Sequence, residues 1–384
     1  MSGPVIQGWC PGAHRPMAAA DGLVVRMRPA LGQITPAQAR GIADLALRFG
    51  TGLIELTSRA NLQLRGVADH AGLMLALDGL GLIDADPAFE ARRNITLTPF
   101  RAAGGREEQI AAALEQALRD PGLASLPGKF GFVVDTGAVR RLAATSGDIR
   151  LEAAGGDLVV RADGSDTGMA VASISDAVEA AVALARWFLG SGGVGADGRG
   201  RMARHLASTP LPEALKGAAQ PNAPEVPARP GFHDGLALFA APFGQMAAQD
   251  LRALADTAPE SLRVTPWRML ALPGLRHMPA LPEGHELIVS PDDPRLRVLA
   301  CTGAPGCPQA SVETRQLAAR LAPYLPDGEL LHVSGCAKGC AHPARATVTL
   351  VGRAGKFDLI RDGAPWGSPD QTGLAPETLT DMIR

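Results

Sequence analysis

The chain alternates between strand-like and helix-like spacing of apolar residues from Asp21 to Gly66. Leu23–Met27 and Leu53–Thr57 predict two short strands, because each is an apolar run bounded by turn residues. Between them, apolar side chains recur at helical spacing, at Ile42, Leu45, Ala46 and Phe49. Thr35–Gln38 can form a capping box with proline at the first helical position, and Gly50 predicts the end of the helix.

The same pattern returns from Asp234 to Gly274, which indicates an internal duplication. In one register, Gly32, Gln33, Arg40, Ala43 and Asp44 match Gly244, Gln245, Arg252, Ala255 and Asp256. After a short deletion, Thr57, Leu62, Leu64 and Gly66 match Thr265, Leu270, Leu272 and Gly274.

The two copies differ in the polarity of their last strand. The first carries Arg59, Asn61, Gln63 and Arg65, where the second has Trp267, Met269, Ala271 and Pro273. We therefore expect the first copy to face a ligand and the second to be structural.

A looser similarity relates Arg92–Asp163 to Arg297–Asp362, each with an early strand, an amphipathic helix and a strand hairpin. Between the two halves lies a segment rich in proline and alanine, which predicts an extended linker. The predicted order is a first half-domain at 15–80, an α/β domain at 88–207, the linker at 208–230, a second half-domain at 231–284 and a second α/β domain at 287–384.

Composition narrows the possible functions. The formal net charge is −2, so no global basic field favours nucleic acid. No apolar run is long enough for a transmembrane helix, and residues 1–22 lack the features of a secretory signal. Five cysteines in 384 residues are too sparse for a disulfide framework, so we expect a cytoplasmic protein.

Four of these cysteines form two spaced pairs, Cys301 with Cys307 and Cys336 with Cys340. Four thiolates are the ligand set of a [4Fe–4S] cluster, and glycines at 303, 306, 335 and 339 would let backbone amides approach the sulfurs. The alternatives are a zinc site, for which these gaps fit poorly, and free thiols or disulfides. Cys10 stands alone and is interpreted as a buried or incidental thiol.

The cysteine spacing and the duplication together resemble the sulfite/nitrite reductase superfamily. This resemblance implies an α+β fold, in which two ferredoxin-like half-domains pair and two larger α/β domains flank them. It also implies a cluster in the last domain beside a tetrapyrrole.

Two segments resemble one branch of that superfamily, the precorrin-3B synthases. They are Gly8–Leu23, which contains Trp9-Cys10-Pro11-Gly12, and Leu331–Pro343, which contains the second cysteine pair. The resemblance implies an oxygen-dependent monooxygenase that hydroxylates precorrin-3A and forms a γ-lactone in aerobic cobalamin biosynthesis. The alternatives are a sirohaem-dependent sulfite or nitrite reductase and a non-catalytic iron–sulfur electron carrier or sensor.

Site residues follow from the same resemblance. Arg59 and Gln63 lie in what looks like the tetrapyrrole-binding pattern Thr-x-Arg-x-x-x-Gln. Further expected contacts of an anionic tetrapyrrole are Arg26, Arg28 and Arg65. Arginine suits this role because it can pair carboxylates in a bidentate manner. The expected catalytic residues are Lys129, Arg93 and His342. Gly131 occupies the place of the second lysine that reductases use, which favours the synthase branch.

Electrons are expected from a reduced nicotinamide or a protein donor. The resemblance also implies an additional mononuclear iron, for which His14, His332 and His342 are candidate ligands, although a structural histidine is an equal interpretation of His332. The glycine-rich stretch Gly190–Gly200 follows a predicted helix rather than a strand, so we interpret it as a loop and not as a dinucleotide-binding motif.

Overall fold

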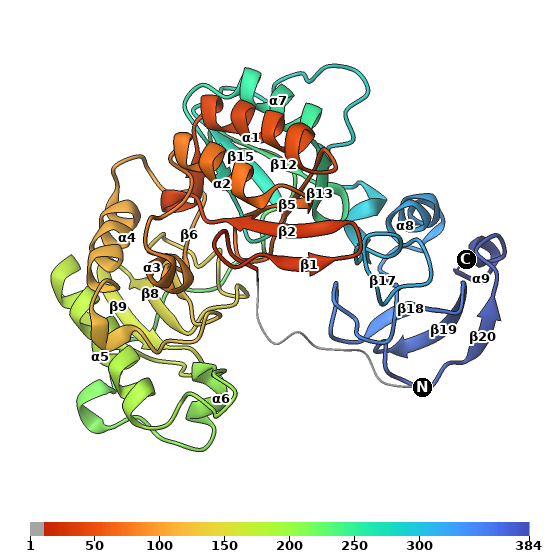
Figure 1. Ribbon diagram of the computed structural model, residues 1–384. Coiled ribbons are helices and arrows are strands. Elements are labelled where there is room, and N and C mark those ends of the chain that lie inside the picture. The colour runs from red at the N-terminus through yellow and green to blue at the C-terminus, as the bar shows by residue number, and fades with distance from the viewer. Residues whose placement is uncertain (1–10, 384) are drawn as a thin grey trace.

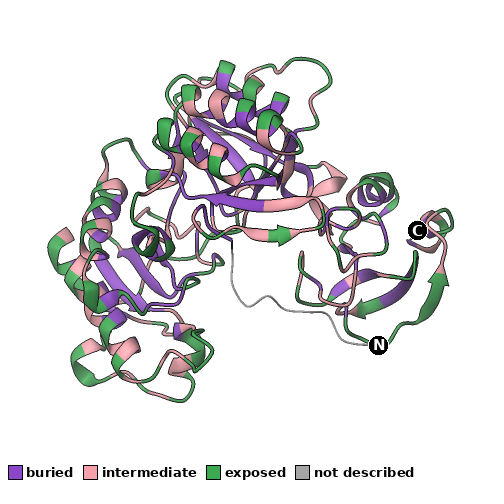
Figure 2. Cartoon of the chain, in the orientation of Figure 1, coloured by how far each residue is buried: buried purple, intermediate pink, exposed green. Residues whose placement is uncertain are grey.

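The computed structural model describes residues 11–383, which form four five-stranded sheets (Figure 1). Most strands and the inward faces of the helices are buried, whereas the outer faces of the helices and the C-terminal edge strand, Gln371–Leu374, are largely exposed (Figure 2). The mixture of sheets and helices confirms the predicted α+β class. Cys10 and the start of the Gly8–Leu23 segment lie outside the described residues.

Two of the sheets are built by the repeated half-domains. The first contains β1 (Met17–Ala19), β2 (Gly22–Met27), β5 (Leu62–Val67), β4 (Leu53–Leu56) and β13 (Gln245–Ala247), in that order. The second contains β11 (Gly231–His233), β12 (Leu236–Ala240), β15 (Met269–Pro273), β14 (Leu262–Val264) and β3 (Gln33–Ile34). Each half-domain therefore contributes its Gly-Gln strand to the sheet of the other, which confirms the duplication.

Helices cover the paired half-domains on one side (Figure 1). They are α1 (Pro36–Phe49), α2 (His70–Gly79) and α7 (Ala248–Thr257). The capping box is confirmed, since the Gln38 amide donates to Thr35 Oγ1 at 3.1 Å and the Thr35 amide to Gln38 Oε1 at 2.9 Å. Apolar side chains of both copies share one core.

The residues repeated between α1 and α7 pair with each other across the two copies. Arg40 of α1 forms an ion pair with Asp256 of α7, and Arg252 of α7 forms one with Asp44 of α1. A two-fold relation between the helices explains why arginine and aspartate recur at the same offset.

The other two sheets also share one topology. The first runs β6 (Ile95–Leu97), β7 (Phe132–Asp135), β8 (Ile149–Ala154), β9 (Asp157–Ala162) and β10 (Met169–Val171). The second runs β16 (Val298–Ala300), β17 (Leu331–Ser334), β18 (Ala346–Arg353), β19 (Lys356–Gly363) and β20 (Gln371–Leu374). In both, the first three strands are parallel and the last two antiparallel.

Helices pack on these sheets too. Those around the first are α3 (Pro87–Arg92), α4 (Arg106–Ala117), α5 (Ile174–Gly190) and α6 (Met202–Leu206), and those on the second are α8 (Arg315–Leu321) and α9 (Leu379–Ile383). Among the helices of residues 11–383, none combines the length and apolar character needed to cross a bilayer.

The segment 208–230 is extended for most of its length, with one short 3-10 turn at Glu213–Leu215. It is not a detached spacer, because the Asn222 side chain donates to the Gly137 carbonyl at 2.9 Å and the Arg140 amide donates to the Ala223 carbonyl at 2.9 Å. The segment therefore packs against the loop that follows β7 while leading to the second half of the chain. The domain boundaries themselves stay a prediction.

Candidate functional site

The two cysteine loops meet at one edge of the last sheet. Cys301 follows β16 directly, and Cys336 follows β17 after Gly335. Because β16 and β17 are parallel neighbours, their carboxyl ends lie side by side. The Gly335 amide donates to Cys301 Sγ at 3.1 Å, and the Lys338 amide donates to the Cys336 thiol. Glycine at 335 thus permits the close backbone approach that the sequence predicted.

All four cysteines of these loops are free thiols in the structure. Burial raises the pKa of the Cys336 and Cys340 thiols, and the neighbouring Cys301 and Cys307 add to the rise. The two motifs, about thirty residues apart in sequence, therefore form one electrostatically coupled group. Binding iron would favour the thiolate forms that this environment disfavours.

The arrangement does not suit a single metal ion. Zinc holds its thiolates roughly 2.3 Å from one point, but within residues 11–383 no three His, Cys, Asp or Glu side chains converge in a way that could hold one ion. The same finding covers a mononuclear iron, for which the described residues likewise show no converging group of three such side chains.

Arg65 joins the first half-domain to the first cysteine loop. Its guanidinium pairs with both oxygens of Asp21, at 3.1 and 3.0 Å, and its Nη2 donates to the Gly306 carbonyl at 2.9 Å. Arg65 is therefore held beside the cysteines and is partly neutralised by a carboxylate. Asp21 was not predicted as a site residue.

A second carboxylate, Glu55 on β4, connects the other residues of this group. Gln63 Nε2 donates to Glu55 Oε2 at 3.0 Å, and Gln63 Oε1 accepts from Arg26 Nε at 2.8 Å. Arg315 on α8 donates to the other oxygen of Glu55 at 2.8 Å. Burial alone would raise the pKa of Glu55, but Arg315, Arg65 and the hydrogen bonds outweigh it and hold the pKa below the ordinary value. A charged residue inside an apolar strand was the available sequence signal for this role.

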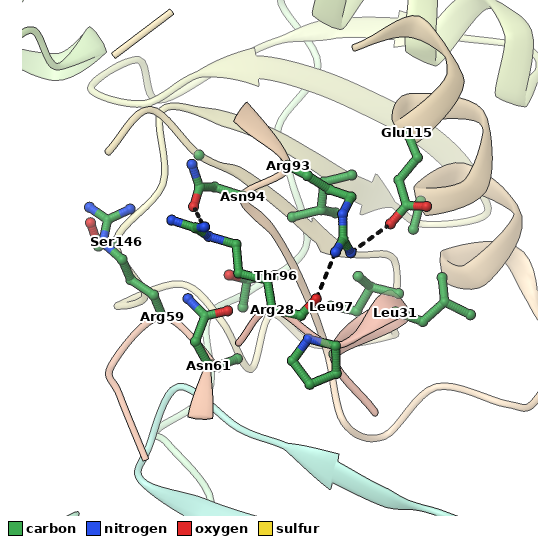
Figure 3. Close-up of a pocket in the computed structure, with 16 residues that line it drawn as sticks. Arg28, Leu31, Arg59, Asn61, Arg93, Asn94, Thr96, Leu97, Glu115 and Ser146 are labelled. Atoms are coloured by element: carbon green, nitrogen blue, oxygen red, sulfur yellow. Dashed lines mark hydrogen bonds and ion pairs between the residues drawn. The ribbon is translucent and has the colours of Figure 1, made fainter. Parts of the chain in front are cut away.

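Three other predicted arginines surround a small cavity beside the first α/β sheet (Figure 3). Arg28, Arg59 and Arg93 line it together with Asn94 and Gly131, and its volume of about 20 Å³ leaves room for roughly one water. Residues from distant segments are thus brought together around one cavity, whereas Arg26 and Arg65 do not line it.

Each of these arginines already has partners within the protein. Arg28 forms a buried ion pair with Glu90 and donates to Asn94 at 3.3 Å. Arg93 donates to the Arg28 carbonyl at 2.7 Å and to the Glu115 carboxylate at 3.3 Å (Figure 3). It also donates to the Asp84 carboxylate at 2.9 Å. These carboxylates, which sequence reasoning missed, balance buried guanidinium groups that would otherwise be costly.

Lys129 lies at the border between this group and a much larger cavity. Its carbonyl accepts from Arg59 Nη1 at 2.9 Å, while its side chain is exposed. Lys129 and Arg28 both line the neighbouring cavity of about 1390 Å³, above the roughly 300–1,000 Å³ typical of drug-sized ligands. This cavity is therefore large enough for a macrocyclic ligand.

The candidate histidines do not form one group. His332 and His342 lie edge to face, with ring centroids 5.7 Å apart, whereas His14 is bonded to the Asp84 carbonyl at 2.6 Å and lines the large cavity. Burial lowers the pKa of His332 to about 4, with a smaller contribution from His342, so His332 is neutral. Within the described part of the chain neither of its ring nitrogens has a hydrogen-bond partner, which does not fit the interpretation of His332 as a hydrogen-bonded structural histidine.

Comparison with known proteins places this geometry in a family. Residues 15–75 match the family model of the nitrite/sulfite reductase ferredoxin-like half domain. The chain is 32% identical to a precorrin-3B synthase of Sinorhizobium sp, over 96% of this chain and 86% of that protein. It is 26% identical to a ferredoxin–nitrite reductase of Synechococcus elongatus, over 94% of this chain and 85% of that protein.

A solved structure shares the fold at lower sequence similarity. The NirA protein of Mycobacterium tuberculosis superposes with a TM-score of 0.66 at 18% identity, covering 94% of this chain and 79% of that chain. The duplicated half-domains, the shared topology of the two larger sheets and the near full-length similarity agree with one another. The chain therefore belongs to the precorrin-3B synthase family, within the nitrite/sulfite reductase superfamily.

Proposed function

We propose that the chain is a precorrin-3B synthase, which uses dioxygen to hydroxylate precorrin-3A and to form a γ-lactone. The observation that carries this proposal is the near full-length similarity to a precorrin-3B synthase. Support comes from the cysteine loops, which lie against the arginine-bearing half-domain through the contact between Arg65 and Gly306.

Cys301, Cys307, Cys336 and Cys340 would hold a [4Fe–4S] cluster in this proposal. When bound, such a cluster supplies single electrons to chemistry in its neighbourhood. Hydroxylation by dioxygen leaves the second oxygen atom as water, so electrons and protons must come from a donor, either a reduced nicotinamide or a protein.

The protein's own residues would bind and orient the macrocycle. Arg28 and Lys129 line the large cavity, where their charges can pair substrate carboxylates. Arg59 and Arg93 hold these two residues in place, because Arg59 donates to the Lys129 carbonyl and Arg93 donates to the Arg28 carbonyl. Arg26, Gln63 and Arg65 form a rigid polar layer beside the cysteine loops.

Sirohaem-dependent reduction of sulfite or nitrite is the second candidate, and the similarity to a nitrite reductase favours it. Gly131 counts against it, because it lines the small arginine cavity where a reductase would present a second lysine. A small oxyanion would meet one fewer cation there.

Anaerobic purification tests the proposal by absorption spectrum, iron and sulfide content, and turnover of precorrin-3A under air. We expect a broad cluster spectrum without sirohaem bands, and a product heavier than the substrate by oxygen in mass spectrometry. Cys307→Ala should abolish cluster content, whereas Cys10→Ala should retain it. A sirohaem spectrum with sulfite or nitrite turnover would replace the synthase by the reductase.

A further inference from the structure

The glycine-rich stretch after α5 forms a compact loop, as predicted, and does not follow a strand. The Gly193 amide donates to the Phe188 carbonyl at 2.8 Å, which closes the end of the helix. The Gly195 amide then donates to the Arg199 carbonyl at 2.7 Å, which closes a short turn. The chain thus reverses direction and leads into α6.

Glycine is required where this loop packs most tightly. A Cβ atom at Gly200 would lie 2.0 Å from the Gly193 carbonyl oxygen, and one at Gly193 would lie 2.3 Å from the Phe188 ring. Any side chain at either position would displace the backbone. Close backbone contacts therefore fix the path of the loop. They also fix the direction in which its arginine side chains project.

This loop and α6 form one side of the large cavity, and Arg28 and Lys129 line it from other elements. Six cationic residues line the cavity, against two carboxylates, Glu90 and Asp197. The cationic residues are Arg15, Arg28, Lys129, Arg199, Arg201 and Arg204. A cavity with this excess of positive charge favours an anionic ligand.

The arginines of the loop differ in how firmly they are held. Arg201 is anchored, since its Nε pairs with the fully buried Asp148 at 2.9 Å and its Nη2 donates to the Gly147 carbonyl at 2.8 Å. Arg199 lies 3.6 Å from the exposed Asp197. In the described part of the chain, no carboxylate lies within ion-pair distance of Arg204 or Lys129. Arg204 can therefore reach a ligand without breaking an internal ion pair.

We propose that the loop 190–201 together with α6 is a carboxylate-binding wall of the substrate cavity. In this arrangement Arg204 and Arg199 pair peripheral carboxylates of a polycarboxylate tetrapyrrole, facing Arg28 and Lys129, and Arg201 is a positioning residue that fixes the loop on Asp148. The wall selects substrates by the number of their carboxylates. The identity of the ligand as a tetrapyrrole rests on the proposed function.

Equilibrium binding of porphyrin probes to the anaerobically purified full chain tests this wall. The probes are uroporphyrin, an octacarboxylate, and coproporphyrin, a tetracarboxylate, followed by fluorescence. Arg204→Gln should raise the Kd for uroporphyrin roughly tenfold, because a charge-assisted hydrogen bond is lost. The loss should be smaller for coproporphyrin, and Arg204→Gln should weaken the salt dependence of binding.

Arg186→Gln is the matched control, because Arg186 is an exposed arginine of α5 that pairs with Asp120 outside the cavity. It should leave both Kd values unchanged. If wild type, Arg204→Gln and the double variant Arg199→Gln/Arg204→Gln bound uroporphyrin with equal Kd, the proposed carboxylate-binding role of the loop and α6 would be wrong. If the variants weaken porphyrin binding but the protein never hydroxylates precorrin-3A, the carboxylate-binding role is supported and the proposed synthase activity is wrong.

Discussion

Asp135, the last residue of β7, is a carboxylate with almost no exposure to solvent. Burial raises its pKa to about 6 from an ordinary value of 3.8, and the nearby Glu152 and Glu107 add to the rise. The Leu142 amide donates to it at 2.7 Å, which opposes the shift only in part. The folded state thus favours the protonated acid more than the unfolded state does.

Replacing this acid should change how stability depends on pH. Between pH 3.8 and about 6 the folded state binds more protons at Asp135 than the unfolded state, so the free energy of unfolding falls as pH rises. The fall is at most ~3 kcal/mol. Asp135→Asn should remove it and increase stability at pH 7 relative to wild type, measured by urea unfolding across this window.

Asp120→Asn is the control, because Arg186 and the Gly122 amide lower the pKa of the exposed Asp120. It should show no gain at pH 7. If the free energy of unfolding depended on pH in the same way for Asp135→Asn and for wild type, the pKa of Asp135 would not be raised in the folded state.

Sequence reasoning identified many charged residues of the site but not their partners. Arg28, Arg59 and Arg93 line one cavity in the structure, although the sequence assigned Arg93 to catalysis and the other two to tetrapyrrole binding, and these roles stay predictions. Glu90 and Glu115 escaped notice because each sits on a helix whose sequence gives no sign of an ion pair to another element. Such pairs form only after tertiary packing removes the arginines from water.

At the level of elements, locally encoded structure was predicted best. The helix α1 begins at its capping box and ends before Gly50, both of which are signals within a few residues. By contrast, α8 begins only at Arg315, and the preceding Val312 carbonyl accepts from the Ala304 amide of the cysteine loop at 2.8 Å. A tertiary contact with the cysteine loop therefore holds the residues before α8 outside the helix.

The glycine-rich loop 190–201 depends on the absence of a side chain at Gly200. Gly200→Ala should disorder the loop, because its Cβ would lie 2.0 Å from the Gly193 carbonyl oxygen. The arginines would lose their fixed direction, so uroporphyrin affinity should fall on the order of tenfold or more. Hydrogen exchange should show faster exchange at 191–201 while the β8–β9 hairpin stays protected.

Gly190→Ala is the matched control, because nothing lies within 4 Å of a Cβ built at that helical glycine. Its affinity and exchange should match wild type. Identical behaviour of Gly200→Ala and Gly190→Ala would mean that the loop does not depend on close backbone packing.

At the scale of the whole molecule, the duplication was visible in the sequence but the exchange of strands was not. The matched glutamines begin β3 and β13, yet each strand lies in the other half-domain's sheet. Periodicity shows which residues form strands and not which sheet they join, because pairing between copies uses the same backbone bonds as pairing within one. The two half-domains are consequently one folding unit.

Glu55 is the point where three parts of the chain meet. It lies on β4 opposite Gln245 of β13, whose amide approaches its carboxylate at 3.4 Å, and it pairs with Arg315 of the cysteine-bearing domain at 2.8 Å. Arg65, which contacts the cysteine loop, lies 3.8 Å from its other oxygen. One carboxylate thus couples both half-domains to the predicted cluster site.

Glu55→Gln should therefore weaken the assembly of the whole molecule. Removing one partner of a buried ion pair costs about 3–5 kcal/mol, because the guanidinium groups remain buried. Since the pKa of Glu55 is lowered, its contribution is present above pH 4.5 and is lost as pH falls, so the variant should also lose part of the acid dependence of stability. Urea unfolding at several pH values and hydrogen exchange at β16 and β17 measure both effects.

The exposed pair between Arg40 and Asp256 supplies the comparison, because it also joins the two copies but lies in solvent. Asp256→Asn should cost less than ~1 kcal/mol and leave exchange at β16 and β17 unchanged. If Glu55→Gln behaved like Asp256→Asn, the coupling would have to come from apolar packing between the half-domains. A larger cost with faster exchange at the cysteine loops would instead locate the coupling in this buried charge network.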